Sequence, residues 1–376
     1  MNTRHTRIVV IGGGIAGVAT AAELASDFDV TIVEQEFQPG YHSTGRSAAV
    51  LHLAFENDVV HRLTRIAEPF YRSPPDGFEL LAEPIDHIAF DTQENRVLVE
   101  SFIDDWIERC PWLTLLDSNE LHSRAPLLSK QNVAGALDSR SMRLHVDAIL
   151  QGYRRLFTEK DGTFLPSRRV ISVERRATNW HLDIGEADPI EAELLVNAGG
   201  AWADEIACIA GIEKIGLQPK RRTGVIVDPH YDYSSHPMCY RASGGIYLKP
   251  EGPLLMVSPA DATDSPPCDA QPEELDVAIV IDTLNKCTKL EVERPVNTWA
   301  GLRSFVADGR PVIGFDPMDD QFFWVAALGG FGIQTVPAYS KIAASVITNS
   351  RGGDLDLVSA DELAPDRFVS NTRSER

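Results

Sequence analysis

The chain has 376 residues, of which 43% are hydrophobic and 24% are charged, and its formal net charge is −20 at neutral pH. This composition is typical of a globular protein with large apolar cores, and the length predicts about two or three domains. The acidic balance argues against nucleic-acid and anionic-membrane partners. The five cysteines form no C-x-x-C pair, so we expect no metal site and no disulfide scaffold.

The N-terminus has some features of a secretory signal, because Arg4 and Arg7 precede an apolar run over residues 8–22. Glycines interrupt this run at the positions that a nucleotide-binding loop requires. No other stretch reaches the roughly 18 apolar residues of a membrane helix. We therefore expect a cytoplasmic protein without a transmembrane segment.

The first 34 residues predict a βαβ unit. Residues 7–12 are short, β-branched and closed by glycine, as in a buried parallel strand. A helix with one apolar face follows, and residues 29–34 form the second strand. A similar step from strand to helix recurs at residues 193–207 and again after residues 322–326, where the helix ends near Asn349 and has Pro337 in its first turn.

The segments between these units are rich in predicted β-structure, with strands at residues 165–174, 180–184 and 223–228 and a hairpin over residues 245–258. We therefore predict a two-domain α/β protein in which a Rossmann-like nucleotide-binding domain is interrupted by a β-rich substrate domain. The predicted nucleotide-binding segments are residues 1–80, 145–215 and 305–376. The predicted substrate-domain segments are residues 81–144 and 216–304.

The loop after the first strand has the pattern G-x-G-x-x-G, formed by Gly12, Gly14 and Gly17, and Glu34 closes the second strand. The first glycine permits the tight turn, the second lets the backbone approach a pyrophosphate, and the third allows close helix packing. A carboxylate at Glu34 would accept hydrogen bonds from a ribose and would repel the 2′-phosphate of NADP. The loop alone does not separate FAD from NAD.

Residues 40–49, with the sequence GYHSTGRSAA, come next. Here the chain resembles the D-amino-acid oxidase and glycine oxidase superfamily of flavoproteins, and within it the bacterial D-arginine dehydrogenases. The resemblance covers nearly the whole chain and extends through collinear segments at residues 196–202, 216–222, 247–250, 298–309 and 329–335. It implies a fold of the glutathione-reductase or D-amino-acid-oxidase type.

The resemblance also implies non-covalent FAD. Residues 43–49 would run along the pyrophosphate and flavin, where small and hydroxylated residues around Arg46 suit an anion. Residues 329–335 would place backbone N–H groups and a helix N-terminus near the flavin pyrimidine ring. The implied cofactor-binding residues are Gly12, Gly14, Ile15, Ala16, Gly17, Glu34, Gln35, Ser43, Thr44, Gly45, Arg46, Ser47, Ala48, Ala49, Val170, Asn197, Ala198, Gly199, Trp202, Arg303, Gly329, Gly330, Gly332, Ile333, Gln334 and Thr335.

By the same resemblance, Arg222 and Arg303 hold the substrate carboxylate and Tyr247 is a third donor. Arginine suits this role because its planar fork meets a carboxylate with two hydrogen bonds. Arg221 precedes Arg222 on a predicted strand, so we expect Arg221 to point away. The implied substrate-pocket residues are Val50, Phe55, Asp86, His87, Met238, Tyr240 and Gly332.

Some pocket positions depart from the family pattern. D-Arginine dehydrogenases have a His and a Tyr near the flavin where this chain has Val50 and Phe55. Their carboxylate for a basic substrate side chain corresponds to either Asp86 or His87. Asp86 would keep cationic D-amino acids plausible, whereas His87 would favour neutral or acidic side chains. The apolar pattern of the strand slightly favours His87.

These features predict an FAD-dependent oxidoreductase that oxidises the CH–NH2 group of a D-amino acid or a related amine carboxylate by hydride transfer to flavin N5. The imino acid produced would hydrolyse to a keto acid and ammonia. The alternatives are an oxygen-using oxidase, a flavoprotein tailoring enzyme that acts on another carboxylate, and a nucleotide-binding protein without catalysis. The sequence leaves open the chirality, the oligomeric state, and whether the electron acceptor is a quinone or dioxygen.

Overall fold

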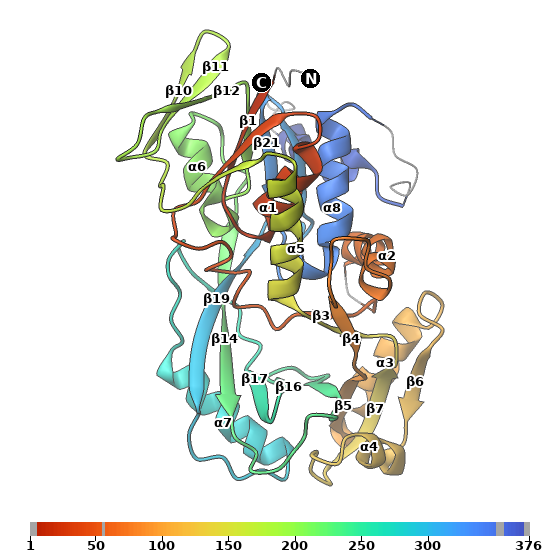
Figure 1. The fold of residues 1–376 in the computed structure, drawn as a ribbon. Coiled ribbons are helices and arrows are strands. Elements are labelled where there is room, and N and C mark those ends of the chain that lie inside the picture. Colours follow the sequence, from red (N-terminus) through yellow and green to blue (C-terminus); the bar gives the residue numbers. More distant parts are fainter. Residues whose placement is uncertain (1–5, 55–56, 351–356, 372–376) are drawn as a thin grey trace.

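The computed structural model describes residues 6–54, 57–350 and 357–371. The chain forms two sheet-centred regions, which lie one above the other in Figure 1. The upper region contains both ends of the described chain and the lower region contains most of the antiparallel strands. No helix in the described ranges combines the length and the apolar character needed to cross a bilayer.

The upper region is built on a six-stranded sheet in the order β20-β21-β13-β1-β2-β9. Its central strands are parallel, as the βαβ pattern predicts, and only β20 runs antiparallel to its neighbour. The strands are β1 (Arg7–Ile11), β2 (Asp29–Val33), β9 (Thr163–Leu165), β13 (Leu194–Asn197), β20 (Val312–Asp316) and β21 (Asp319–Ala326).

Different elements cover the two faces of this sheet. Even-numbered residues of β1 pack with the helices on one face, and odd-numbered residues pack with a small sheet and a short helix on the other. The helices on the first face are α1 (Ile15–Leu24), α2 (Asp58–Arg72), α5 (Val146–Glu159) and α8 (Gly332–Ile347). The second face is covered by the small sheet of β10 (Ser172–Arg176), β11 (Asn179–Asp183) and β12 (Ile190–Ala192) and by the short helix α6 (Ala203–Ile209).

The lower region is built on a nine-stranded sheet in the order β18-β14-β17-β16-β15-β5-β7-β6, with β19 also paired to β14. The strands are β5 (His87–Thr92), β6 (Leu113–Leu116), β7 (Asn132–Asp138), β14 (Gln218–Val227), β15 (Met238–Arg241), β16 (Tyr247–Glu251), β17 (Leu254–Ser258), β18 (Thr263–Asp264) and β19 (Asn297–Phe305). Its helices are α3 (Arg96–Trp106), α4 (Ser118–Arg124) and α7 (Glu274–Cys287).

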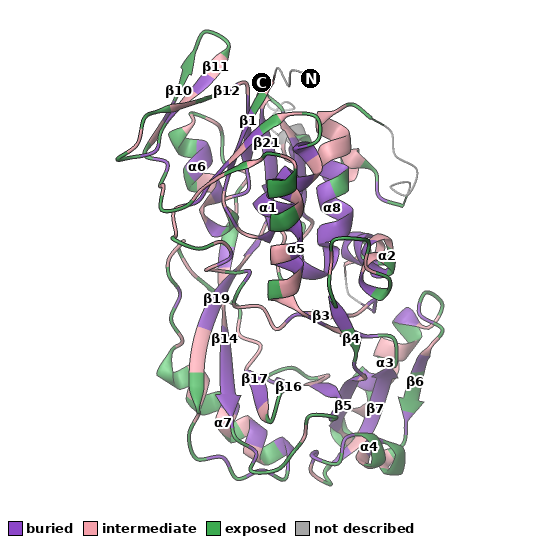
Figure 2. Ribbon diagram, in the orientation of Figure 1, coloured by how far each residue is buried: buried purple, intermediate pink, exposed green. Residues whose placement is uncertain are grey.

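Short elements connect the two regions or end the chain. A three-stranded sheet in the order β3-β8-β4 joins strands from three distant segments. These strands are β3 (Val50–Leu51), β4 (Ala82–Pro84) and β8 (Met142–Leu144), and the 3-10 turns are η1 (Gln93–Asn95), η2 (Gly200–Trp202), η3 (Ala360–Glu362) and η4 (Pro365–Asn371). Figure 2 shows that the strands of both large sheets are mostly buried, as are α1 and α8, whereas α7 has a largely exposed surface.

The two-domain α/β prediction is confirmed, as are the first βαβ unit and the hairpin formed by β16 and β17. The strand predicted over residues 165–174 is wrong, because β9 ends at Leu165 and β10 begins only at Ser172. Pro337 lies in the second turn of α8, not in the first. It cannot donate to the carbonyl of Ile333, which instead accepts a hydrogen bond from the buried Tyr71 hydroxyl.

Candidate functional site

An elongated cavity lies between the two large sheets, with about 1640 Å³ of space including the part open to solvent. The upper region contributes residues at the carboxyl ends of β1, β2, β13 and β21. The lower region contributes side chains of β14, β16, β17 and β19. Ligands of open α/β sheets bind at the carboxyl ends of the strands, so this is the expected location for a nucleotide.

The glycine loop forms the first wall of the cavity. Gly12 has a φ of +115°, and a Cβ atom there would lie 2.4 Å from the carbonyl oxygen of Ala198. A Cβ atom at Gly17 would lie 1.9 Å from the Gly12 oxygen. The packing of β1, β13 and α1 therefore requires both glycines, and this packing directs the N-terminus of α1 at the cavity.

Glu34 lies at the end of β2, where its carboxylate accepts hydrogen bonds from the backbone N–H groups of Gly13 at 2.5 Å and Glu36 at 2.8 Å. Burial raises the pKa of Glu34 despite these two donors. Each carboxylate oxygen has two lone pairs, so both oxygens retain acceptor capacity for a ribose hydroxyl.

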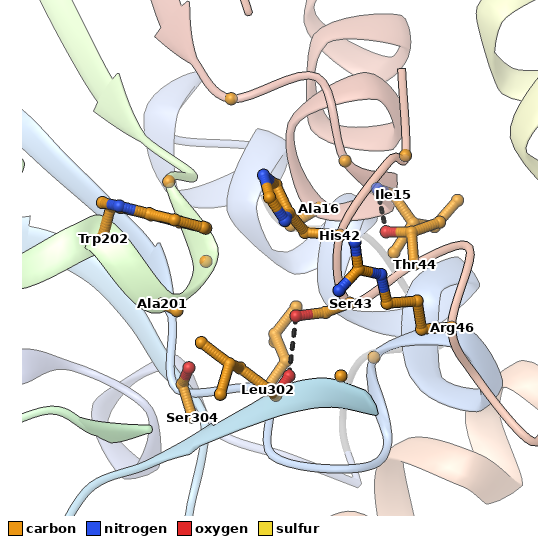
Figure 3. Close-up of a pocket in the computed structure, with 18 of the residues that line it drawn as sticks. Ile15, Ala16, His42, Ser43, Thr44, Arg46, Ala201, Trp202, Leu302 and Ser304 are labelled. Atoms are coloured by element: carbon orange, nitrogen blue, oxygen red, sulfur yellow. Dashed lines mark hydrogen bonds between the residues drawn. The ribbon is translucent and has the colours of Figure 1, made fainter. Parts of the chain in front are cut away.

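Residues 43–46 run past the N-terminus of α1, and their side chains fix them to both regions (Figure 3). The hydroxyl oxygen of Thr44 accepts a hydrogen bond from the N–H of Ile15 at 3.1 Å, and the Ser43 hydroxyl donates to the Leu302 carbonyl at 2.6 Å. Arg46 donates to the carboxylate of Asp269 at 2.5 Å and to backbone carbonyls of Ala270 and Ala300. The Arg46 guanidinium thus anchors this segment through protein contacts.

The N-terminus of α8 and the loop before it form another part of the cavity wall, through Gly329, Gly330, Gly332 and Ile333. Gly330 lies against the side chain of Arg303, because a Cβ atom at Gly330 would be 3.0 Å from Nη1 of that arginine. This contact brings an arginine of the lower region to the carboxyl end of the upper sheet.

Two arginines face the cavity from neighbouring antiparallel strands. Arg222 of β14 is paired in register with Gly301 of β19, and Lys220 is paired with Arg303. Residues in register, or two positions apart on one strand, share a face of the sheet, so Arg222 and Arg303 project from the same face. Tyr247 of β16 lies in the same cavity and makes a hydrogen bond with Arg222.

Burial and the positive charge of Arg303 lower the pKa of Arg222. The Nε atom of Arg222 is buried without a hydrogen-bond partner. In the described part of the chain, neither guanidinium has a carboxylate within ion-pair distance. Asp261 partly offsets the lowering of the Arg222 pKa from beyond ion-pair distance. Two cations without a direct carboxylate partner in one cavity favour an anionic ligand.

Arg221 points away from the cavity, as predicted from strand alternation. Its guanidinium pairs with the carboxylates of Glu273 and Asp276 beside α7, and Asp261 lies 3.9 Å away. The adjacent arginines of β14 therefore have opposite environments, because successive side chains project from opposite faces of a strand.

Most of the predicted cofactor-binding residues line the cavity, and six do not. Gly17 and Gly45 pack against backbone carbonyls. The Asn197 side-chain amide donates a hydrogen bond to the carbonyl of Ala203, the first residue of α6. The side chain of Gln334 donates a hydrogen bond to the Thr64 hydroxyl, and the hydroxyl of Thr335 donates one to the Phe331 carbonyl. Ala49 has a φ of +53° and lies at the turn just before β3. The predicted residues that do line it are Gly12, Gly14, Ile15, Ala16, Glu34, Gln35, Ser43, Thr44, Arg46, Ser47, Ala48, Val170, Ala198, Gly199, Trp202, Arg303, Gly329, Gly330, Gly332 and Ile333.

Of the predicted substrate-pocket residues, Gly332 lines the cavity and Phe55 lies outside the described residues. Asp86 does not line it, since its carboxylate pairs with the exposed Arg124 at 3.1 Å. His87 does not line it either, because its ring is buried between the rings of His52 and Tyr240, each 4.9 Å away between centroids. This burial lowers the pKa of His87 well below its usual range.

The other three predicted pocket residues, Val50, Met238 and Tyr240, do not line the cavity. They pack in an apolar cluster with Tyr247 and Met256, which do line it.

The sequence analysis missed several cavity residues on the lower sheet. Gly224 and Met256 line the cavity, and so does Trp299. On β19, two positions separate Trp299 from Gly301 and Gly301 from Arg303. Because side chains alternate along a strand, all three lie on one face. That spacing was the available signal for Trp299, whereas nothing in the local sequence indicates that Met256 reaches the cavity.

The comparisons with known proteins agree with this arrangement. The chain is 23% identical to the glycine oxidase of Bacillus subtilis (strain 168), with 92% of this chain and 94% of that protein covered. It is 22% identical to the mouse FAD-dependent oxidoreductase domain-containing protein 1, with 93% and 82% covered. The crystal structure of L-proline dehydrogenase from P. horikoshii superposes with a TM-score of 0.83 at 23% identity, covering 97% of this chain and 98% of that one.

The family model described as FAD dependent oxidoreductase (DAO) matches residues 7–346, which include both sheets and every cavity wall described above. The resemblance to the superfamily is thereby confirmed. The chain belongs to the DAO family of FAD-dependent oxidoreductases, and its cofactor is FAD.

Proposed function

We propose that this protein oxidises the CH–NH2 group of an amino acid or a closely related amine carboxylate to an imino acid, which water then converts to a keto acid and ammonia. The observation that carries the proposal is the pair of cavity-facing arginines, Arg222 and Arg303, without a carboxylate partner in the described chain. Two of the similar proteins, a glycine oxidase and an L-proline dehydrogenase, are named for amino-acid substrates.

The cavity fits FAD. Gly12 has no side chain, and its surroundings leave no room for a Cβ atom. A pyrophosphate can therefore approach the N-terminus of α1 closely. Gly14 to Ala16 and the segment from Ser43 to Ala48 would hold the pyrophosphate, and Glu34 would bind the ribose. FAD bound there supplies the two-electron acceptor that oxidation of a C–N bond requires.

The residues of the chain bind and orient the substrate. The guanidinium groups of Arg222 and Arg303 can each give a carboxylate two parallel hydrogen bonds, and the Tyr247 hydroxyl can give a third contact. Fixing the carboxylate at this place orients the adjacent α-carbon toward the upper region, where Gly330 contacts Arg303. This positioning lowers the entropic part of the barrier.

The test is anaerobic bleaching of the flavin absorption band by amino acids in Arg303→Ala. Removing one member of a buried charge-assisted contact costs about 2–5 kcal/mol, so the second-order rate constant for reduction should fall by roughly 10²–10³-fold. Arg221→Ala is the matched control, because Arg221 faces the other side of the sheet and its loss should leave reduction within about 3-fold.

In this experiment FAD content is measured from the ratio of flavin to protein absorbance, and both variants should retain FAD. Unchanged reduction in Arg303→Ala would contradict the clamp. A holoprotein that no amine carboxylate reduces would contradict the proposed function as a whole.

The D configuration and the electron acceptor extend the proposal on the basis of the resemblance to D-amino-acid dehydrogenases. D- and L-forms of one amino acid, compared under the same anaerobic conditions, test the configuration. Reoxidation of the reduced protein by dioxygen and by a soluble quinone, each at equal concentration, tests the acceptor. Faster reoxidation by dioxygen would identify an oxidase.

A further inference from the structure

Trp299 holds its indole flat against the lower sheet inside the cavity. It is paired in register with Gly224 of β14, and a Cβ atom at Gly224 would lie 2.5 Å from two ring carbons of the indole. Only glycine at this position leaves room for the ring. A glycine within a strand often marks such a close approach.

A hydrogen bond fixes the other edge of the ring. The indole Nε1–H donates to the backbone carbonyl of Arg46 at 3.3 Å, and Arg46 belongs to the segment that runs past the start of α1. The Arg46 side chain is itself anchored to Asp269. Trp299 is therefore held in one orientation by both regions of the molecule.

Trp299 lies beside the proposed carboxylate clamp on the same face of the lower sheet. Trp299 and Gly224 lie two residues along the sheet from Gly301 and Arg222, which corresponds to about 7 Å. Met256 and Tyr247 line the cavity beside the ring, and all three belong to or contact one apolar cluster.

The charged side chains that the lower region contributes to the cavity lining are Arg222 and Arg303. Lys249 is buried on the strand face that holds Tyr247, but it pairs with Glu251 at 2.8 Å and does not line the cavity. Two carboxylates line the cavity in the described chain, Glu34 and Glu205, and both belong to the upper region. Asp86, the predicted partner of a basic side chain, is bound to Arg124.

We propose that the Trp299 indole is the wall of the substrate's side-chain subsite and that this subsite takes an uncharged, apolar side chain. The inference rests on the proposed function, because the clamp at Arg222 and Arg303 sets where the side chain begins. A cationic side chain would meet Arg222 and Arg303, and no carboxylate of the described lower region lines the cavity to pair with it. An anionic side chain would lose hydration against Trp299 and Met256.

The experiment measures anaerobic flavin reduction of the holoprotein by glycine, D-alanine, D-leucine, D-phenylalanine, D-arginine and D-glutamate. We expect the second-order rate constants for the leucine and phenylalanine substrates to exceed those for arginine and glutamate at least 10-fold. Preference for arginine or glutamate, or reduction by glycine alone, would overturn the proposal while leaving the proposed function intact. If neither these substrates nor the corresponding L-amino acids reduce the flavin, the proposed function itself fails.

Variants then test the role of the ring. Trp299→Ala should reduce the preference for D-leucine over D-alanine, measured as the ratio of the two rate constants, at least 10-fold. Trp299→Phe should restore most of the preference, since it keeps an aromatic wall and removes only the hydrogen bond to Arg46. Trp112→Phe is the matched control, because it also removes an indole hydrogen bond, to Asp138, outside the cavity.

Equal decreases in the rate constants for D-alanine and D-leucine in Trp299→Ala would overturn the inference. A residue that only supports the fold or the Arg46 segment would affect reduction by both substrates alike. FAD content is measured in each variant to separate weakened cofactor binding from weakened substrate binding.

Discussion

The two ends of the cavity are built in different ways. The dinucleotide end consists largely of backbone groups and small residues from short, contiguous segments, such as Gly12 to Ala16 and Ser43 to Ala48. The substrate end consists of large side chains from four strands of the lower sheet, including Arg222, Tyr247 and Trp299. Ligand binding at the dinucleotide end should therefore be impaired by any added side-chain atom. Ligand binding at the substrate end should be impaired by the loss of particular functional groups.

The largest effect is expected from Gly12→Ala, because the new Cβ atom would meet the Ala198 carbonyl at 2.4 Å in a conformation that side chains rarely adopt. We expect loss of bound FAD and a fall of about 3 kcal/mol or more in the free energy of unfolding. The absorbance ratio of flavin to protein and a denaturant titration measure these two quantities.

Gly211→Ala is the matched control for Gly12→Ala, since Gly211 also has a positive φ but no atom lies within 4 Å of its added Cβ. It should lose only about 1 kcal/mol through backbone strain and should retain FAD. Equal effects of the two substitutions would show that backbone conformation alone, and not the close approach to β13, limits the glycine loop.

A smaller effect is expected from Arg222→Lys, which retains the positive charge at the substrate end but removes the planar fork. Flavin reduction by the preferred amino acid should slow by about 10–100-fold, corresponding to roughly 1.4–2.8 kcal/mol. Stopped-flow absorbance under anaerobic conditions measures this change. If lysine serves as well as arginine, charge alone holds the carboxylate and the paired hydrogen bonds are dispensable.

The smallest effect is expected from Glu34→Gln at the dinucleotide end. The variant loses the negative acceptor for a ribose hydroxyl, so the Kd for FAD should rise by about 10-fold. Fluorescence of free flavin during titration of the FAD-free protein measures this affinity. An unchanged Kd would mean that the carboxylate contacts only the N–H groups of Gly13 and Glu36.

Glu34→Gln also tests whether the stability of the FAD-free protein rises or falls with pH. Burial raises the folded-state pKa of Glu34 above 4.5, so its contribution to stability is present at low pH and is lost as the pH rises through the folded pKa. Relative to Glu34→Gln, the FAD-free wild-type protein should thus lose stability as the pH rises from about 4.5. Thermal unfolding of both proteins across this range checks the slope, and an opposite slope would show that the two N–H donors outweigh burial.

Local sequence patterns determined much of the fold and of the dinucleotide end. The parallel strands, the glycine loop and the acid at Glu34 follow one another within 34 residues, and their spacing reflects backbone geometry that such motifs share. The opposite directions of Arg221 and Arg222 also followed from alternation along a strand. The proposed clamp pair was accessible only through the family resemblance, because Arg222 and Arg303 lie far apart in the chain.

Tertiary structure alone decided which residues other than the predicted arginines, Tyr247 and Gly332 line the lower end of the cavity. Asp86 and His87 are neighbours in sequence, yet one pairs with Arg124 at the surface and the other is buried between two rings. Trp299 reaches the cavity because β19 pairs with β14 in a register that sets its ring over Gly224. Such contacts depend on strand register and domain packing, which bring together residues whose local patterns carry no information about one another.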